Sequence, residues 1–207
     1  MITLFTFGSP HGHRASIMLE ELGLPYRLHL LEFTGGPIED PGLLGASPMG
    51  KAPALLDERD GSKRRIFGSG AILTYLAAEA GRFLPTEPVA RAEAESWFMM
   101  AVADLSPASI GHFRFSVLAP ERQDYAVDYY RRELERCYDA LDLRLREAEY
   151  LGGAEYGIAD IACYPFIDYA FKATDPAATH PGLARWYNEV GARPAVQRGM
   201  QVPPLAL

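Results

Sequence analysis

The sequence predicts a small α/β domain followed by an all-α domain. Strand-like and helix-like segments alternate over the first part of the chain, whereas only helical periodicity follows residue 88. Between the two lies a proline-containing stretch, Leu84-Pro85-Thr86-Glu87-Pro88, which is typical of a linker. We therefore expect an α/β domain at residues 1–82, a linker at residues 83–88 and an all-helical domain at residues 89–207.

Composition narrows the class of protein. The chain has 207 residues, 48% of them hydrophobic, which is ordinary for a globular protein. Its formal net charge of -7 disfavours nucleic acids and anionic membranes as partners. Its two cysteines, Cys137 and Cys163, lie outside any Cys-x-x-Cys motif, so neither a disulfide scaffold nor a metal site is expected. The absence of a signal-peptide pattern and of a long apolar run predicts a cytoplasmic protein.

The first domain opens with a predicted strand–helix–strand unit. Residues 3–7 form a short β-prone run. Ser9 is a good N-cap and Pro10 suits the first helical position, and Gly23 is a typical helix stop. Tyr26–Phe33 is predicted to be the second strand. Because the connections are short, the two strands should be parallel.

A turn-rich stretch, residues 47–56, runs directly into a third predicted strand at residues 54–57. Pro53 stands where that strand begins and cannot donate to a sheet ladder. An X-Pro bond also adopts the cis form at small cost. We therefore expect a bend that leaves the backbone of Ala52 free to pair with an extended peptide ligand. A turn, an antiparallel fourth strand at residues 63–67 and a helix from about Ser69 to its stop at Gly81 complete a βαβ-ββα pattern, similar to the thioredoxin fold.

The second domain reads as helices alone. Pro107 and Gly111 predict a kink or break in the first of them. A turn at Thr174-Asp175-Pro176 should close the third. The expected helices cover residues 89–115, 125–149, 158–171, 181–192 and 194–201.

Four short motifs stand out along the chain. They are Ser47-Pro48-Met49-Gly50-Lys51-Ala52-Pro53-Ala54-Leu55, Phe67-Gly68-Ser69-Gly70-Ala71-Ile72, Tyr150-Leu151-Gly152-Gly153 and Ile158-Ala159-Asp160-Ile161-Ala162. They resemble motifs of the glutathione transferase family, and they occur in the family's order and spacing along nearly the whole chain. The resemblance implies a glutathione-binding first domain and a helical domain that forms the co-substrate pocket. It also implies a two-fold homodimer.

Ser9 is the first candidate catalytic residue. Its hydroxyl follows the first strand and can donate to a thiolate near the positive end of a helix, which favours the charged sulfur. Its alternative role is that of an N-cap only. Ser9-Pro10-His11-Gly12 most resembles the Thr-Pro-Asn-Gly of the bacterial nu-class and Ure2-like branch. His11 replaces the asparagine and is the second candidate, as a donor to sulfur or as a general base; the alternative is an exposed histidine without a partner.

Ser69 opens a helix, where free N–H groups and the helix dipole bind carboxylates. The resemblance assigns Ser69 to the γ-glutamyl carboxylate of glutathione; its alternative role is an ordinary N-cap. Gly68 stands where the family usually has Glu or Asp, an acid that helps to place the γ-glutamyl end. This departure predicts weaker binding or the use of another carboxylate.

The resemblance completes the glutathione site with the loop before the third strand. It implies that the backbone of Ala52, held by a cis-Pro53, pairs with the cysteinyl residue of glutathione. Lys51 would reach the glycyl carboxylate, and its alternative role is that of a solvated loop lysine.

In the helical domain the resemblance assigns two further roles. Gly157 and Asp160 correspond to a capping box before a core helix, which we interpret as structural. Residues 112–115, His-Phe-Arg-Phe, lie where related proteins line the electrophile pocket. Helix packing with surface charge is the alternative interpretation of these four residues.

The sequence therefore predicts a glutathione transferase that activates glutathione as thiolate. The thiolate would be conjugated to an electrophile or would reduce a disulfide or peroxide, with no metal required. Since the first domain has no cysteine, glutathione itself would reduce a disulfide. A non-catalytic binding or regulatory protein of the same fold is the alternative, and Gly68 favours it. Substitution of Gly68 by Glu discriminates the two, because a large gain in affinity would indicate a site that has drifted from its ligand.

Overall fold

A computed structural model of the chain describes all residues except 34, 122, 174–177 and 205–207. It divides into two compact units, each treated separately below. The first unit is Met1–Arg82 together with the chain from Gly191 onwards, and the second is Phe83–Val190. The predicted turn at Thr174-Asp175-Pro176 lies outside the described residues.

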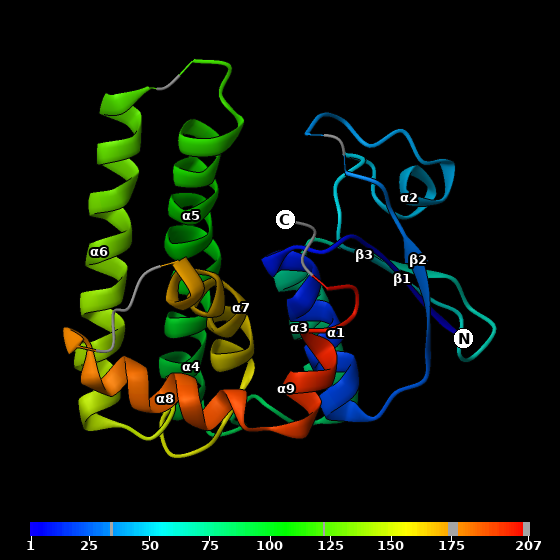
Figure 1. Ribbon diagram of the computed structural model, residues 1–207. Coiled ribbons are helices and arrows are strands. Elements are labelled where there is room, and N and C mark those ends of the chain that lie inside the picture. Colours follow the sequence, from blue (N-terminus) through cyan, green and yellow to red (C-terminus); the bar gives the residue numbers. More distant parts are fainter. Residues whose placement is uncertain (34, 122, 174–177, 205–207) are drawn as a thin grey trace. The chain divides into compact units, whose positions relative to one another are not determined.

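The first unit is a mixed sheet with helices on both faces (Figure 1). The described strands order as β2-β1-β3-β4. As predicted, β1 and β2 are parallel, while β3 runs antiparallel to β1 and to β4. The elements are β1 Ile2–Thr6, α1 Pro10–Leu22, β2 Tyr26–Leu30, α2 Pro41–Ala46, β3 Ala54–Asp57, β4 Arg64–Phe67, α3 Ser69–Ala80 and α9 Pro194–Gly199.

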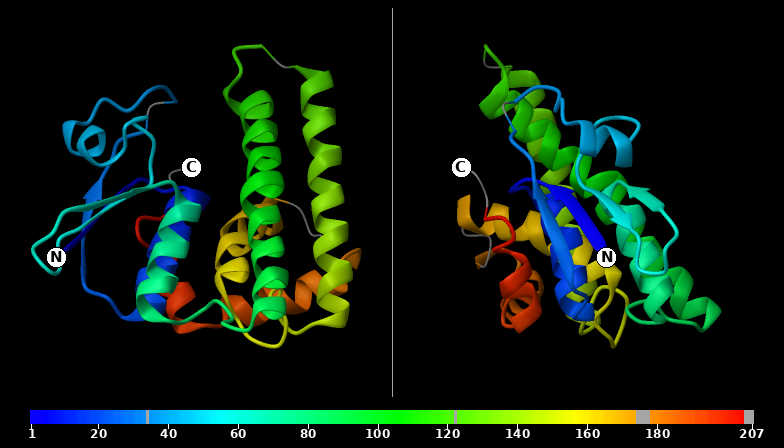
Figure 2. Two further views of the ribbon diagram at one scale, coloured as in Figure 1. Left: turned by 180° about the vertical axis from the view of Figure 1, so that it is seen from behind. Right: turned by 90° about the vertical axis from the view of Figure 1, so that its right-hand side faces the viewer.

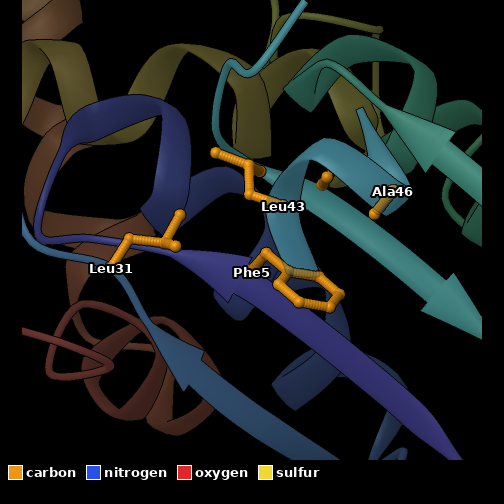
Figure 3. Close-up of a cluster of buried hydrophobic side chains, with 5 residues drawn as sticks. Phe5, Leu31, Leu43 and Ala46 are labelled. Atoms are coloured by element: carbon orange, nitrogen blue, oxygen red, sulfur yellow. The ribbon is translucent and has the colours of Figure 1, made fainter. Parts of the chain in front are cut away.

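The two faces of β1 build two apolar layers, because successive side chains of a strand point to opposite sides. Leu4 is fully buried on the side of the sheet that α1 and α3 cover (Figures 1 and 2). Phe5 lies on the other side, beneath α2, in a cluster drawn in Figure 3. That cluster contains Phe5, Leu31, Leu43, Ala46 and Ala54. The sheet is therefore buried on both faces near the point where β1 meets α1.

The predicted helix signals are found where the sequence places them. Ser9 caps α1, Pro10 is its first residue, and Gly23 ends it in the left-handed conformation at φ 62°. Gly81 ends α3 in the same way at φ 60°. The second strand was expected to reach Phe33 but ends at Leu30. Its partner β1 ends at Thr6, and the last bond between the two segments runs from Leu31 N to Thr6 O.

Helix α2 is an element that the sequence interpretation missed. Asp40 caps it by accepting from Leu43 N at 2.7 Å, and Pro41 is its first residue. A helix of six residues is too short to show an amphipathic period, so only the Asp-Pro pair signals it.

The described residues from Gly191 to 204 belong to the first unit, whereas the sequence interpretation assigned them to the helical domain. Helix α9 packs on α1, and Gly199 is so close that a Cβ there would lie 2.5 Å from the Cα of Ile17. Ser16 Oγ donates to Gly199 O at 2.7 Å. Arg193 forms a two-bond ion pair with Glu21. Helical periodicity alone cannot reveal this placement, because it says nothing of which unit a helix packs on.

The second unit is helical throughout its described residues (Figure 1). Its elements are α4 Pro88–Met100, the π-helix η1 Ala101–Leu105, α5 Ser106–Phe113, the π-helix η2 Arg114–Leu118, α6 Asp124–Glu147, α7 Ile158–Ala173 and α8 Pro181–Gly191. The kink or break predicted at Pro107 and Gly111 is instead a continuous helix with a wider π turn on each side. Pro107 has no N–H to donate, and the wider turn before it accommodates this loss within the helix. The hydroxyl of Ser106 donates to the carbonyl of Ala101 at 2.6 Å. No helix among the described residues is both long and apolar enough to cross a membrane.

Candidate functional site

The candidate site lies in the first unit and is built from the N-termini of α1 and α3 and the loop before β3. Ser9 follows β1 in extended conformation and caps α1, since its Oγ accepts from Gly12 N at 3.1 Å. The same hydroxyl donates to Phe7 O at 3.3 Å, at the long end of the hydrogen-bond range. Its N-cap role is therefore confirmed, and a proton so weakly held can turn to an incoming acceptor.

Gly12 allows β1 and α1 to meet this closely. A Cβ at this position would lie 2.3 Å from Thr6 Oγ1 and 2.7 Å from Phe7 O, both nearer than any real contact. The glycine therefore sets how near the end of β1 approaches the positive end of the helix, where Ser9 lies.

His11 lies in the first turn of α1 and is half-buried. Burial lowers its pKa from 6.5 to about 3, and the positive charge of Arg14 lowers it further in the same direction. The imidazole is therefore neutral at physiological pH. A neutral imidazole still donates one N–H. A conjugate acid this strong is a weak base, so the lowered pKa favours the donor role over the general-base role that the sequence left open.

Ala52 presents free backbone groups. The Ala52–Pro53 peptide bond is cis, as the resemblance implied. Among the hydrogen bonds of the described residues, none uses the N–H or the C=O of Ala52. Pro53 O accepts from Gly68 N at 3.1 Å, which joins this loop to the start of α3. An extended peptide can therefore pair with Ala52 beside the α3 N-terminus, in the manner of strand addition.

Ser69 is the first residue of α3 and is 5% exposed. Its Oγ accepts from Arg14 Nη1 at 3.2 Å. Within the described chain the Ser69 hydroxyl donates to no other residue. The first N–H groups of the helix also have no intrahelical acceptor, and Gly68 offers no side chain to cap them. These donors all lie at the N-terminus of α3, a place suited to a carboxylate.

Gly68 has a conformational reason to be glycine. Its φ is +85°, a region that side chains rarely adopt, while a Cβ would meet nothing within 4 Å. An acid at this position has room for its side chain but strains the backbone. The replacement of the family's usual acid by glycine therefore removes a carboxylate and relieves a strained residue at once.

Lys51 is exposed, and its backbone N–H bonds Ser47 Oγ at 3.3 Å. Among the described residues its ammonium forms no ion pair. The structure therefore leaves the Lys51 side chain available to a ligand and does not bring it into the buried part of the site.

Arg14 is a site residue that the sequence interpretation missed. It is fully buried in α1 and connects two candidates, because it donates to Ser69 and acts electrostatically on His11. One signal was available in the sequence. Arg14 precedes Met18 by four residues, so it lies on the apolar face of the helix, where an arginine needs a buried partner.

In the second unit, Asp160 is a structural residue, as expected. It is fully buried and accepts from Leu151 N, Gly157 N and Trp186 Nε1 at 2.8 to 2.9 Å. Gly157 departs from the family's Ser or Thr because a Cβ there would lie 2.7 Å from Phe83 O.

The predicted pocket segment also packs within the second unit. Phe113 meets Tyr169 edge-on, and the ring of Phe115 stacks on Tyr130 at 5.9 Å. Across the described part of the chain, no group of His, Cys, Asp and Glu side chains is arranged to hold a metal ion.

Two family models match the chain. "Glutathione S-transferase, N-terminal domain" matches residues 8–79, and "Glutathione S-transferase, C-terminal domain" matches residues 102–194. The disulfide-bond oxidoreductase YfcG of Escherichia coli is 35% identical over 203 residues, covering 97% of this chain and 94% of YfcG.

Solved structures agree with this match. A glutathione transferase family member from Pseudomonas fluorescens, with two glutathione bound, has a TM-score of 0.88 at 33% identity, covering 98% of this chain and 93% of that one. The glutathione transferase URE2P6 from Phanerochaete chrysosporium, in complex with oxidized glutathione, has a TM-score of 0.89 at 28% identity, covering 97% and 94%.

Proposed function

Since the chain belongs to the glutathione S-transferase family, we propose that it is an enzyme that binds glutathione, holds it as thiolate and uses it to reduce disulfides. One observation carries the proposal, and it concerns the hydrogen bonds of the described residues. Among them, the N–H and C=O of Ala52 have no partner, and the buried Ser69 hydroxyl, which accepts from Arg14, has no acceptor for its own proton. Buried polar groups in folded proteins are normally paired, so groups left open point to a ligand.

The tripeptide matches these groups. Its γ-glutamyl carboxylate would accept from Ser69 and from the first N–H groups of α3. Its cysteinyl residue would pair with both backbone groups of Ala52, as a short added strand. Lys51, exposed and free, would meet the glycyl carboxylate. In this proposed register the sulfur would lie on the α1 side of the loop, near Ser9.

The thiolate would be stabilised by neutral donors and by a helix end. A free thiol has a pKa of about 8.5, so most of it is protonated at neutral pH. Ser9 would turn its hydroxyl from Phe7 O to the sulfur, and His11 would donate an N–H without adding charge. The positive end of α1 favours the anion further.

Glutathione is the only reductant needed to reduce a disulfide substrate. The bound thiolate attacks one sulfur of the substrate, which forms a mixed disulfide with glutathione and releases the other sulfur as a thiolate. A second glutathione thiolate then attacks the glutathione sulfur, which yields glutathione disulfide and the second substrate thiol. Two glutathione molecules supply both electrons.

The protein's own cysteines are poor candidates for this chemistry. Cys163 is fully buried in α7, and burial raises the pKa of Cys137 to about 11. Thiols of that kind are inert, because the thiolate is the nucleophile. The names of YfcG, a disulfide-bond oxidoreductase, and of the URE2P6 complex with oxidized glutathione fit disulfide reduction better than conjugation.

The test is calorimetric titration with reduced and oxidised glutathione beside turnover of hydroxyethyl disulfide and of an aryl halide. We expect binding of reduced glutathione in the micromolar to millimolar range, with turnover of the disulfide exceeding that of the aryl halide. Ser9→Ala should bind reduced glutathione as the wild type does, yet lose about 10- to 100-fold in kcat, since it removes a donor to the reacting sulfur.

A non-catalytic binding protein is the second candidate, and the missing acid at Gly68 favours it. Binding of glutathione without turnover of any of these substrates would support that candidate. If neither form of glutathione binds, both readings of the site are wrong.

A further inference from the structure

We propose that Arg14 is a positioning residue that orients the Ser69 hydroxyl toward the ligand carboxylate, and this inference rests on the proposed glutathione site. Arg14 lies one turn below the N-terminus of α1, and Ser69 opens α3. The two helices pack side by side on the same face of the sheet (Figures 1 and 2). A direct contact, Arg14 Nη1 to Ser69 Oγ at 3.2 Å, joins them at this end.

The direction of the bond matters. A guanidinium only donates, so Ser69 Oγ must accept from Arg14 and one lone pair of the hydroxyl is occupied. The remaining proton then points away from the guanidinium. Within the described chain it meets no acceptor. Arg14 thus leaves Ser69 as a donor held ready at the helix N-terminus.

Burial protects the Arg14–Ser69 hydrogen bond from competition by water. Arg14 is 0% exposed and Ser69 is 5% exposed, so little water competes for either group. In such surroundings hydrogen bonds polarise one another, and a hydroxyl that accepts from a cation becomes a stronger donor. The first N–H groups of α3 lie at the same helix N-terminus and have no side-chain cap. A carboxylate there would receive one hydroxyl proton and backbone protons together.

Arg14 also acts on the other half of the site. Its charge lowers the pKa of His11, although burial is the larger cause. Because burial is the larger cause, His11 should stay neutral without Arg14, so variants of Arg14 should act mainly on the carboxylate end through Ser69.

The inference is tested with two ligands that differ in a single group. One is glutathione, and the other is its analogue γ-aminobutyryl-cysteinyl-glycine, which lacks the γ-glutamyl carboxylate. We expect Arg14→Met to weaken glutathione about tenfold while it leaves the analogue unchanged, because only glutathione offers an acceptor to Ser69. The expected kinetic signature is a raised KM for glutathione with kcat unchanged at saturation.

Matched variants separate positioning from folding. Ser69→Ala should also weaken glutathione and not the analogue, and Arg14→Met should have little further effect in that background. Arg14→Lys keeps the cation but loses the planar fork, so we expect an intermediate loss for glutathione alone. If Arg14→Met does not fold, the Lys variant and Ser69→Ala still decide the question with the same two ligands.

Three results overturn the inference. The first is an equal loss of affinity for both ligands in the Arg14 variants. The second is an unchanged affinity for glutathione, and the third is additive losses in the double variant. Failure of the wild type to bind glutathione would overturn the proposed function itself, which distinguishes that failure from one of Arg14 alone.

Discussion

At the scale of single residues, the folded environment sets the charge of His11 and the backbone conformation of Gly68, and the sequence position of neither residue reveals these properties. His11 occupies the first turn of a helix and yet is neutral, because burial and Arg14 both oppose its charge. Gly68 stands in place of an acid and yet has a backbone conformation suited to glycine. Each of these leads to a prediction that isolates one physical cause.

His11 should make the protein less stable in acid. Its folded pKa of about 3 lies below the ordinary 6.5, so the folded state resists a proton that the unfolded state accepts. Its contribution is complete above pH 6.5 and is lost as the pH falls from 6.5 toward 3. Asn does not titrate. We therefore expect His11→Asn to have the higher free energy of unfolding in acid, by up to about 2 kcal/mol at about pH 5.

Urea unfolding of the wild type and His11→Asn at a series of pH values checks this prediction. The two curves of stability against pH should run parallel in the alkaline range and separate in acid. Curves that stay parallel down to about pH 4 would show that His11 is protonated in the folded state.

Gly68→Ala should cost about 1–3 kcal/mol of stability, because its φ of +85° strains any side chain while space is available for the Cβ. Gly61→Ala is the matched control: its φ is +82° and a Cβ there also meets nothing within 4 Å. We expect similar losses in thermal unfolding for both variants. Only position 68 should alter glutathione affinity.

The variant Gly68→Glu separates the cost of backbone strain at position 68 from the effect of a carboxylate on glutathione binding. Compared with Gly68→Ala, it shares the backbone cost and adds a carboxylate. A large gain in glutathione affinity relative to Gly68→Ala would mean that the natural site lacks a group it can still use. Equal affinities would mean that the ammonium of glutathione is held elsewhere.

At the scale of elements, helix ends and close approaches decide the geometry. In the second unit, Asp160 at the start of α7 ties the loop before that helix to α8 through Leu151 and Trp186. Burial raises its pKa to about 6, although its three donors favour the charged form. One carboxylate therefore holds several segments together while ionising with difficulty.

Asp160→Ala should cost about 3–5 kcal/mol, because Leu151 N, Gly157 N and Trp186 Nε1 would be buried without an acceptor. Asp160→Asn should cost less, about 1–3 kcal/mol, since one oxygen remains to accept. Trp97 and Trp186 both lie in the second unit, so tryptophan emission during urea unfolding reports on this change.

The wild type adds a test by pH. Because the folded pKa of Asp160 is raised from 3.8 to about 6, its favourable contribution is complete in acid and is lost as the pH rises through about 6. Asp160→Asn should remove that loss. A cost below about 1 kcal/mol for Asp160→Ala would mean that water replaces the carboxylate.

At the scale of the whole molecule, α9 joins the unit that the N-terminal part of the chain forms, although most of the second unit lies between them in the sequence. Helix α9 lies on α1, held by the Ser16–Gly199 bond and by ion pairs of Arg193 and Arg198 with Glu21 and Glu20. The helix that carries Ser9 and Arg14 is thus fixed by residues from the far end of the sequence. Stability of the site should depend on that end.

Gly199→Ala tests this dependence. The new Cβ would lie 2.5 Å from Ile17 Cα and 2.6 Å from Ile17 N, and backbone atoms cannot turn away. We expect a loss of about 1–3 kcal/mol or more in thermal unfolding, with faster hydrogen exchange in α1. Gly45→Ala in α2 is the control, since a Cβ there meets nothing within 4 Å. Equal stability of the two variants would mean that α9 shifts freely.

Local signals in the sequence determined the strands, α1 and α3 of the first unit, and the family. Caps at Ser9, Gly23 and Gly81, the βαβ connection and the proline before β3 act within a few residues, so they can be read directly. The glutathione motifs are also contiguous in the sequence, and they indicate Ser69 and Ala52.

Only the tertiary structure decided what depends on partners distant in sequence. The packing of α9 on α1, the burial that keeps His11 neutral and the bond from Arg14 to Ser69 each join segments that no local pattern relates. Periodicity could place Arg14 on a buried face but could not name its partner 55 residues away. The physical reason is that burial and hydrogen-bond pairing are properties of the folded environment, whereas caps and turns are properties of the local chain.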